Sequence, residues 1–220
     1  MPNAGHALAS TQSAPQRKRR QVLDAASSLF MAQGYGATSM DAVARAAGVS
    51  KATLYAYFSG KDALFAAIVG EACSRHAAAG EGGHANDAAD VGAALGAIGR
   101  GYLAFLFRED VLAIWRVVMA EGPRFPELSR AFFESGPLRL LTWLAGWMRA
   151  RQGEGALAPG DPTVMAEQFL ALLRTSAFMR RMLGLPVTEA AMAEEKAIEA
   201  AVDAAIATFL AAFGPRQALS

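Results

Sequence analysis

The stretch from residue 50 to residue 65, SKATLYAYFSGKDALF, gathers side chains that bind rather than side chains that react. It contains two lysines, two tyrosines and one carboxylate, Asp62, but neither histidine nor cysteine. Ammonium and phenol groups donate hydrogen bonds to phosphate oxygens and base edges, whereas catalysis needs converging acid, base or nucleophilic groups. The stretch therefore favours a surface for a polyanion over an active site.

The charge of the chain is distributed unevenly. Between Met1 and Lys61 there are seven lysines and arginines and only two acidic residues, a net charge of +5. The rest of the chain holds fourteen basic and eighteen acidic residues, so it carries −4, and the whole chain carries +1. A basic head on a mildly acidic body indicates that an anionic partner meets the head.

The composition gives little support to an enzyme, a metalloprotein, a secreted protein or a membrane protein. The three histidines are scattered, and Cys73, His76, His84 and Asp87 do not have the spacing of a tight metal site, so we expect no metal, no cofactor and no enzyme activity. The single cysteine excludes an intramolecular disulfide and fits a reducing compartment. No apolar run approaches the roughly 18 to 20 residues of a membrane span, and the N-terminus lacks the pattern of a signal peptide. We expect a cytoplasmic protein.

The elements that position the basic stretch are predicted to be short helices. Apolar residues recur at spacings of three and four, and strand signals are almost absent, which predicts an all-α fold. After a disordered tail over 1–16, a first helix is expected over 17–33. Thr38 to Asp41 resembles a capping box for a second short helix, and a second box over 59–62 opens a fourth helix.

The third helix, over 51–58, carries the functional prediction. Ser50 is placed to cap it, and Gly48 suits the left-handed turn before it. Leu54 and Phe58 fall on one side, where they can be buried, and small and hydroxylated residues cover the rest. A short helix, a glycine turn and a second short helix make the helix-turn-helix pattern, in which the second helix enters the major groove of DNA. A solvated element of a helical bundle is the alternative.

Charge geometry assigns roles to individual residues. Backbone N–H groups at helix starts attract phosphate, which indicates anion sites at Thr38-Ser39 and at the helix that begins near Lys61. Lys51 and Tyr55 are the candidates for base edges, and Arg17 to Arg20 can follow the DNA backbone or enter a minor groove. The complete predicted DNA-binding set is Arg17, Arg19, Arg20, Thr38, Ser39, Ser50, Lys51, Ala52, Thr53, Tyr55, Tyr57 and Lys61.

The residues from Arg20 to Phe65 resemble the DNA-binding domain of the tetracycline-repressor (TetR) family. The matching pieces are LFMAQGYGATS before the second helix, AGVSKATLY across the turn and YFSGKDALF into the fourth helix. The resemblance implies a homodimer that represses transcription and is released from palindromic operator DNA by a small molecule bound in the C-terminal domain. Matched position by position, it implies groove-facing roles for Ser50, Lys51, Ala52 and Tyr55. It implies phosphate contacts for Thr38, Ser39, Tyr57 and Lys61.

The remainder of the chain, 66–215, is predicted to be a helical domain for ligand binding and dimerisation. A loop is expected over 77–90, followed by helices over 91–107, 109–121, 126–150 with an interruption at Gly136-Pro137, 162–184 and 188–212. The stretches WRVVMAEGPRFPELSRAFFESGP and AEQFLALLR resemble the C-terminal domain of the AefR-type branch, which is often linked to efflux-pump regulation.

Two groups of apolar residues in this domain are candidates for binding. Aromatic and methionine side chains suit a pocket for a flat apolar effector, and the candidates are Tyr102, Phe105, Trp115, Met119, Trp143, Trp147 and Phe178. Two helices that are apolar over wide faces can pair with their copies in a dimer, and the predicted interface is Phe169, Leu172, Leu173, Ile198, Val202, Ala205 and Phe209.

We therefore predict a transcriptional repressor that an apolar ligand releases, with control of an efflux or detoxification gene as one role. An activator or architectural DNA-binding protein without ligand control needs the same head, so the sequence does not separate it from a repressor. A helical carrier or enzyme for an apolar metabolite is a third alternative. The effector, the operator and the target genes are open.

Overall fold

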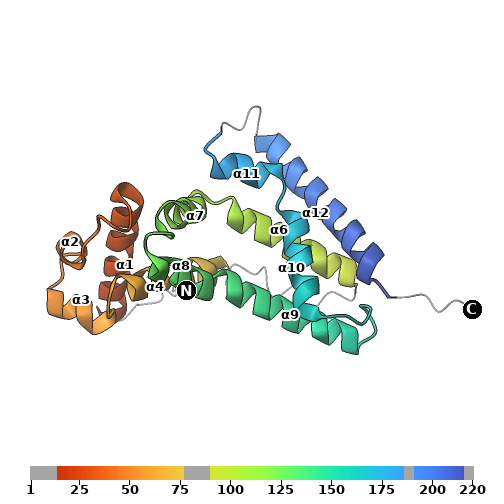
Figure 1. Cartoon of the computed structure of the whole chain (residues 1–220), viewed down its shortest axis with the longest axis horizontal. Coiled ribbons are helices and arrows are strands. Elements are labelled where there is room, and N and C mark those ends of the chain that lie inside the picture. The colour runs from red at the N-terminus through yellow and green to blue at the C-terminus, as the bar shows by residue number, and fades with distance from the viewer. Residues whose placement is uncertain (1–13, 77–89, 186–190, 216–220) are drawn as a thin grey trace, which may run out of the picture. The chain divides into compact units, whose positions relative to one another are not determined.

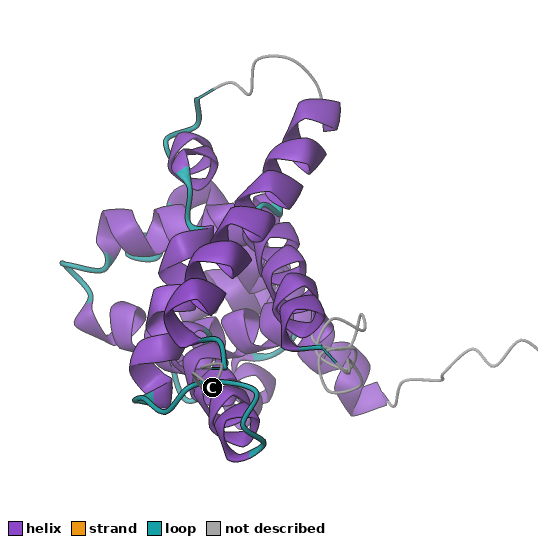
Figure 2. Cartoon of the chain, turned by 90° about the vertical axis from the view of Figure 1, so that its right-hand side faces the viewer, coloured by secondary structure: helices purple, strands orange, loops and turns teal. Residues whose placement is uncertain are grey.

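A computed structural model describes residues 14–76, 90–185 and 191–215 of the chain. Within these residues the chain forms helices and connecting loops and no strand, which confirms the all-α prediction (Figure 2). The chain divides between Phe65 and Ala66 into two compact units. The helix α4 (Lys61–His76) contributes residues to both. The expected loop over 77–90 lies outside the described residues except for Asp90.

The first unit is built from α1 (Ala14–Gln33), α2 (Met40–Ala46), α3 (Lys51–Tyr57) and the start of α4 (Figure 1). Its core is made of apolar side chains spaced by three or four residues along α1 and of single residues from the other helices. Those with no exposed surface are Val22, Ala26, Phe30, Val43, Leu54, Leu64 and Phe65. Because α2 and α3 have seven residues each, their stability must come from this packing.

The helix α1 begins at Ala14, earlier than the predicted start at Arg17. Pro15 is compatible with a helix here because a first-turn residue has no helical partner for its N–H. Its carbonyl oxygen accepts a hydrogen bond from the Tyr57 hydroxyl at 3.3 Å. Residues 14–16 of the predicted disordered tail are therefore helical, and residues 1–13 lie outside the described part of the chain.

The start of α2 differs by one residue from the predicted capping box. Ser39, not Thr38, is the N-cap, and its hydroxyl accepts a hydrogen bond from the amide of Ala42. The Thr38 hydroxyl donates instead to the carbonyl of Gly34 at 2.8 Å. Thr38 is thus part of the loop before α2. The cap of α3 was predicted correctly, since Ser50 accepts from the amide of Thr53.

The turn between α2 and α3 is closed by backbone hydrogen bonds. The amide of Val49 donates to the carbonyl of Ala44 at 3.0 Å, and that of Gly48 donates to the carbonyl of Arg45 at 3.2 Å. Gly48 has a φ of 64°, in the left-handed region. This is a Schellman motif, and it sets the direction in which the chain enters α3.

The second unit contains the remainder of α4 and a bundle of helices. These are α6 (Val91–Leu106), α7 (Glu109–Glu121), α8 (Pro126–Ser135), α9 (Pro137–Gly153), α10 (Pro162–Leu173), α11 (Ser176–Met182) and α12 (Ala191–Phe213). The interruption at Gly136 was predicted. Asp90 caps α6 by accepting hydrogen bonds from the amides of Gly92 and Ala93. Residues 188–190 of the last predicted helix lie outside the described residues.

The single helix predicted over 162–184 is wrong. It is broken after Leu173, where Arg174 has a ψ of 79° and Thr175 a ψ of 179°. No glycine or proline marks the break, and Nε of Arg174 donates to the hydroxyl of Tyr102 at 3.2 Å. Arg174 thus leaves the helical path of α10 and contacts Tyr102 on α6.

The core of the second unit lies where α10 packs on α9 and α12 and where α12 packs on α6. The helices approach closely at Gly99, where an added Cβ would lie 3.2 Å from side-chain atoms of Leu173 and Val202. Five residues predicted for the dimer interface are buried in this core of a single chain: Phe169, Leu173, Val202, Ala205 and Phe209. Ile198 packs against the same core, and only Leu172 is well exposed. Most of the residues predicted for the dimer interface therefore lie on the faces of α10 and α12 that pack inside a single chain.

Two glycine substitutions should change stability in opposite directions. Gly48→Ala should lower the free energy of unfolding by about 1–2 kcal/mol, because an L residue is strained at this φ. A Cβ meets no atom within 4 Å at either Gly48 or Gly146, so no clash contributes. Gly146→Ala, inside α9, should raise it by about 0.5–1 kcal/mol. Urea unfolding followed by circular dichroism measures both, and equal effects would contradict the turn geometry.

Candidate DNA-binding site

The outer face of α3 is exposed, and its inner face is held in the core. Lys51, Ala52, Tyr55 and Ala56 are exposed, with Tyr55 showing 52% of its surface. Leu54, the residue before Tyr55 and about 100° away around the helix, shows none. Because Ala52 and Ala56 are small, the backbone of α3 can approach a neighbouring surface closely. Shape and exposure thus suit insertion into a groove.

Three polar residues at the start of α3, Ser50, Lys51 and Thr53, are already engaged in hydrogen bonds or ion pairs. The hydroxyls of Ser50 and Thr53 lie 2.8 Å apart, next to the Ser50 cap. Nζ of Lys51 lies 2.6 Å from an Asp41 carboxylate oxygen on α2, and both side chains are largely exposed. A surface pair of this kind contributes about 0–1 kcal/mol. Lys51 can therefore exchange Asp41 for a base or phosphate at little cost.

Two of the residues predicted to contact phosphate, Thr38 and Ser39, precede α2 and differ in exposure. Ser39 is exposed at the N-cap of α2, where backbone N–H groups favour an anion. Thr38 is 2% exposed, and its hydroxyl also accepts a hydrogen bond from Gln33. The Thr38 side chain is therefore too buried to make the phosphate contact that was predicted for it. At this helix start the exposed side chain is that of Ser39.

The basic residues of α1 are placed beside the end of α3. The Arg19 guanidinium lies 5.5 Å from the ring centroid of Phe58, and Tyr57 reaches the carbonyl of Pro15. Arg17 is exposed one helical turn from the start of α1. Nε of Arg20 donates to the Asp24 carboxylate at 3.1 Å. The arginines thus continue the exposed basic surface from α3 onto α1.

Lys61 was predicted to contact a phosphate, but its side chain is directed at the loop between α1 and α2. Its ammonium donates to the carbonyl of Tyr35 at 2.9 Å and to that of Gly36 at 3.4 Å. Sequence reasoning missed Tyr35 as a partner, because the two residues are far apart in the chain. It also missed the pairing of Asp41 with Lys51, since Asp41 was assigned to a capping box.

The predicted pocket residues of the second unit do not line one site. Trp115 makes edge-to-face contacts with Phe132, at 4.9 Å between ring centroids, and with Phe178, at 6.0 Å. These three rings, from α7, α8 and α11, form what we call the Trp115 cluster. Tyr102 and Trp147 are instead buried in the bundle core, with Phe105 half-buried. Met119 is 66% exposed and Trp143 is also exposed, so neither side chain lines an enclosed pocket as predicted.

A charged network joins α11 to α7 beside the Trp115 cluster. Two guanidinium nitrogens of Arg116 donate to the carbonyls of Arg181 and Met182, at 2.6 and 3.3 Å. These carbonyls end α11, where a cation is favoured by the helix dipole. Glu109 lies 3.8 Å from Arg116 and 3.4 Å from Arg181. The short α11 is thereby held against α7.

Buried polar groups occur elsewhere in the second unit. Burial raises the pKa of the Tyr102 phenol, an effect that the neighbouring Arg174 opposes. Burial also raises the pKa of the Cys73 thiol, so this cysteine is less reactive than an exposed one. Within the described part of the chain, the indole N–H of Trp147 has no hydrogen-bond partner. Among the described residues no group of acidic, histidine or cysteine side chains is arranged to hold a metal ion.

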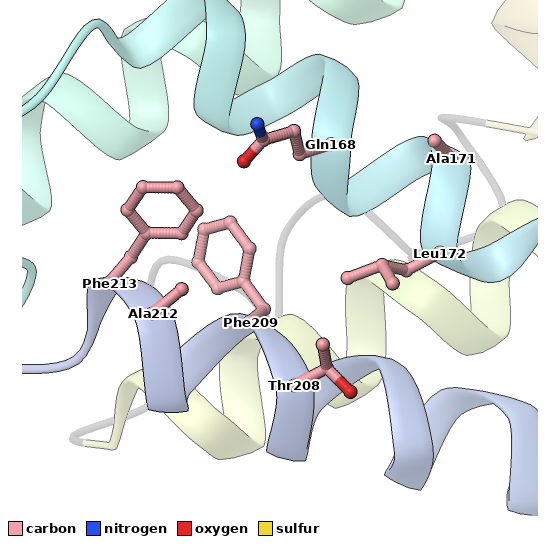
Figure 3. Close-up of a pocket in the computed structure, with 7 residues that line it drawn as sticks. All are labelled: Gln168, Ala171, Leu172, Thr208, Phe209, Ala212 and Phe213. Carbon is pink, nitrogen blue, oxygen red and sulfur yellow. The ribbon is translucent and has the colours of Figure 1, made fainter.

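A groove of about 380 Å³ opens between α10 and α12 (Figure 3). Apolar side chains supply most of its lining, and Gln168 and Thr208 are its polar members. The rings of Phe209 and Phe213 lie side by side on α12, with centroids 5.0 Å apart, and Leu172 faces them from α10. The groove thus lies on the outer side of the two helices whose inner sides form the core.

A capped short helix, presented by a glycine turn on a basic three-helix unit, defines a helix-turn-helix DNA-binding protein. Profiles of two families match the chain: "Bacterial regulatory proteins, tetR family" over residues 22–68, and "AefR-like transcriptional repressor, C-terminal domain" over residues 93–215. The chain belongs to the TetR family of transcriptional regulators and has an AefR-like C-terminal domain. Regulators of this family bind operator DNA and act as dimers.

Individual relatives agree with this assignment. The flavonoid-responsive regulator FrrA has a solved structure that is similar with a TM-score of 0.73 and 38% identity, covering 91% of this chain and 99% of that one. The transcriptional regulator UidR of Escherichia coli K12 is 29% identical over 163 residues, 72% of this chain and 79% of UidR. The transcriptional activator FasR of Mycolicibacterium smegmatis is 48% identical over 56 residues, 25% of this chain and 26% of FasR. No described helix is long and apolar enough to cross a membrane.

Tyr55→Ala should relax the sequence preference of the protein at one or two base pairs. Tyr55 is 52% exposed and is not one of the buried core residues, so the fold should be retained. We expect a cost of about 1–3 kcal/mol at the affected positions and little change on random DNA. Binding to a set of single-base operator variants measures this. Equal losses on specific and random duplexes would show that Tyr55 does not contact bases.

Proposed function

We propose that the protein is a repressor that holds a palindromic operator as a homodimer and is released by an aromatic small molecule. The observation that carries the proposal is the exposed outer face of α3, which is fixed by the burial of Leu54 and Phe58 behind it. The AefR-like repressor profile over 93–215 supports repression rather than activation. The protein would act in the cytoplasm, where its DNA lies.

A dimer is required for the proposed operator geometry. Two copies of α3 related by a two-fold axis reach successive major grooves when they are about 34–36 Å apart. An inverted repeat then presents the same bases to each copy. Footprinting on the DNA next to the protein's own gene is the direct test, and protection of one non-palindromic half-site would contradict the dimer.

The groove between α10 and α12 supports the position of the dimer interface. Its apolar lining includes the exposed Leu172 and the rings of Phe209 and Phe213. An exposed apolar surface of this kind is suited to another protein surface. The same groove on a second copy, brought opposite by a two-fold axis, forms a self-complementary contact.

The Trp115 cluster supports an aromatic effector. Rings that already meet edge to face can accept a further ring in their group, because aromatic pairs favour such geometry. The Arg116 and Glu109 side chains lie on the same helix and can orient a polar group of the ligand. The name of FrrA, flavonoid-responsive, agrees with a planar polyphenol as the class to test first. Regulation of an efflux or detoxification gene remains part of this proposal.

An activator is the second candidate. The similarity to the activator FasR covers only the DNA-binding head, which repressors and activators share. The position of the operator separates the two: a site that overlaps the promoter gives repression, and a site upstream of it allows activation. Transcription from the adjacent promoter in vitro, with and without the protein, distinguishes these outcomes.

Leu172→Asp should convert the dimer to monomers. A carboxylate left unpaired in an apolar interface costs on the order of 3–5 kcal/mol, which weakens association by about two to four orders of magnitude. Leu138→Asp on α9 is the matched control, because Leu138 is 39% exposed and Leu172 38%. Analytical ultracentrifugation measures both. Positions 205 and 209 do not suit this test, since Ala205 and Phe209 are buried within one chain. A dimer that survives Leu172→Asp would place the interface elsewhere.

Trp115→Leu should weaken the binding of naringenin, a flavonoid probe, by about 0.5–1.5 kcal/mol, the value of one aromatic contact. Trp143→Leu, at an exposed position on α9, should leave it unchanged. Titration calorimetry gives both affinities. Saturating naringenin should also weaken operator binding by about 1–3 kcal/mol of coupling. Binding of the probe with unchanged operator affinity would contradict induction by this class of compound.

A further inference from the structure

The ammonium group of Lys61 lies in a binding site made by the loop between α1 and α2. It lies 2.9 Å from the carbonyl oxygen of Tyr35, 3.4 Å from that of Gly36 and 4.5 Å from the centroid of the Tyr35 ring. Carbonyl oxygens and the face of an aromatic ring all attract a cation. Three such groups around one ammonium indicate a specific contact rather than a solvated side chain.

The loop that binds this ammonium is rigidly attached to the core. The Tyr35 side chain is 1% exposed and stacks on Phe30 with ring centroids 5.4 Å apart, and its ring edge meets Phe65 at 6.0 Å. The carbonyl of Tyr35 also accepts the amide of Thr38 at 3.3 Å. The same carbonyl therefore holds both Lys61 and the residue that precedes the N-cap of α2.

The N-cap of α2 is the part of the DNA-binding surface that follows this loop directly. Ser39 is exposed there, and its hydroxyl caps the helix. The position of the first α2 amides depends on the path of the chain from residue 34 to residue 38. Lys61 is the first residue of α4, which continues past Phe65 into the second unit. The ammonium thus connects the start of α4 to the start of α2.

We infer that Lys61 is a positioning residue, which orders the loop before α2 and through it the exposed N-cap of that helix at Ser39. In this role its charge is used inside the protein, not against a DNA phosphate. The inference rests on the DNA-binding function of the first unit and is independent of the proposed effector and of the proposed dimer surface. Together with the contact of Phe65 with the Tyr35 ring, Lys61 joins the start of α4 to the loop before α2.

The test compares Lys61→Met with the unaltered protein, because methionine keeps most of the aliphatic stem and removes the charge. Hydrogen exchange of the amides of residues 34–42, measured without DNA, should become about tenfold faster, as expected for the loss of a charge-assisted hydrogen bond. Exchange in the rest of the first unit should be unchanged. Unchanged exchange in this loop would overturn the inference.

Salt dependence distinguishes positioning from a phosphate contact. Affinity of Lys61→Met for a duplex taken from the DNA beside its own gene should fall about tenfold, with an unchanged slope of log affinity against log salt. A direct phosphate contact would instead lower the slope by about 0.9 per subunit and leave the loop exchange of the free protein unaltered. That second result would overturn the inference without touching the assignment of DNA binding.

Two further variants control for charge and folding. Lys61→Arg retains a cation that can donate to both carbonyls, and it should keep loop exchange within about twofold of the unaltered protein. Lys18→Met removes a lysine from the exposed side of α1 and should leave loop exchange unchanged. If Lys61→Arg loses protection as fully as Lys61→Met, or if Lys18→Met loses it too, the ammonium site is not what orders the loop.

Discussion

The DNA-binding surface depends on one constraint, that helices of seven residues do not hold their shape in water unless they bury a face. Val43 of α2 and Leu54 of α3 satisfy it because both are fully buried, as is Phe30 of α1 in the same unit. That packing decides which residues remain outside. Tyr55 and Lys51 face solvent because Leu54 cannot, and the Schellman turn at Gly48 prevents α3 from rotating to another register. The burial of one face of α3 thus determines which of its side chains are exposed and can contact DNA.

Local signals in the sequence predicted local structure well. The cap at Ser50, the turn at Gly48 and the interruption at Gly136 each depend on a few adjacent residues, and each was found where it was predicted. The features that were missed depend on distant partners. The Thr38 hydroxyl donates to the carbonyl of Gly34 and does not cap α2, and Arg174, at the end of α10, donates to Tyr102 on another helix.

Burial explains the remaining differences in the second unit. Apolar spacing along α10 and α12 showed that more than one face is covered, but spacing alone cannot say which face meets the same chain and which meets a copy. Phe209 was assigned to the interface and is buried in the core, although its ring also borders the groove. The three tryptophans all lie in apolar helical segments, but they occupy three different environments. Trp115 lies in a cluster of aromatic rings, Trp143 is exposed at the surface and Trp147 is buried in the core.

The break between α10 and α11 also affects how a change in helix length is transmitted along the chain. A continuous helix transmits every insertion as a rotation of about 100° per residue to all that follows, whereas the extended link at Arg174 and Thr175 does not. Phe178 and the carbonyls held by Arg116 lie after this link, and Leu172 and Gln168, the α10 side of the groove, lie before it. Under the proposed assembly, a change in the length of α11 therefore leaves the α10 side of the pairing surface in register. The α12 side of the groove follows α11 in the chain, so its register depends on the packing of α12 against α6 and α10.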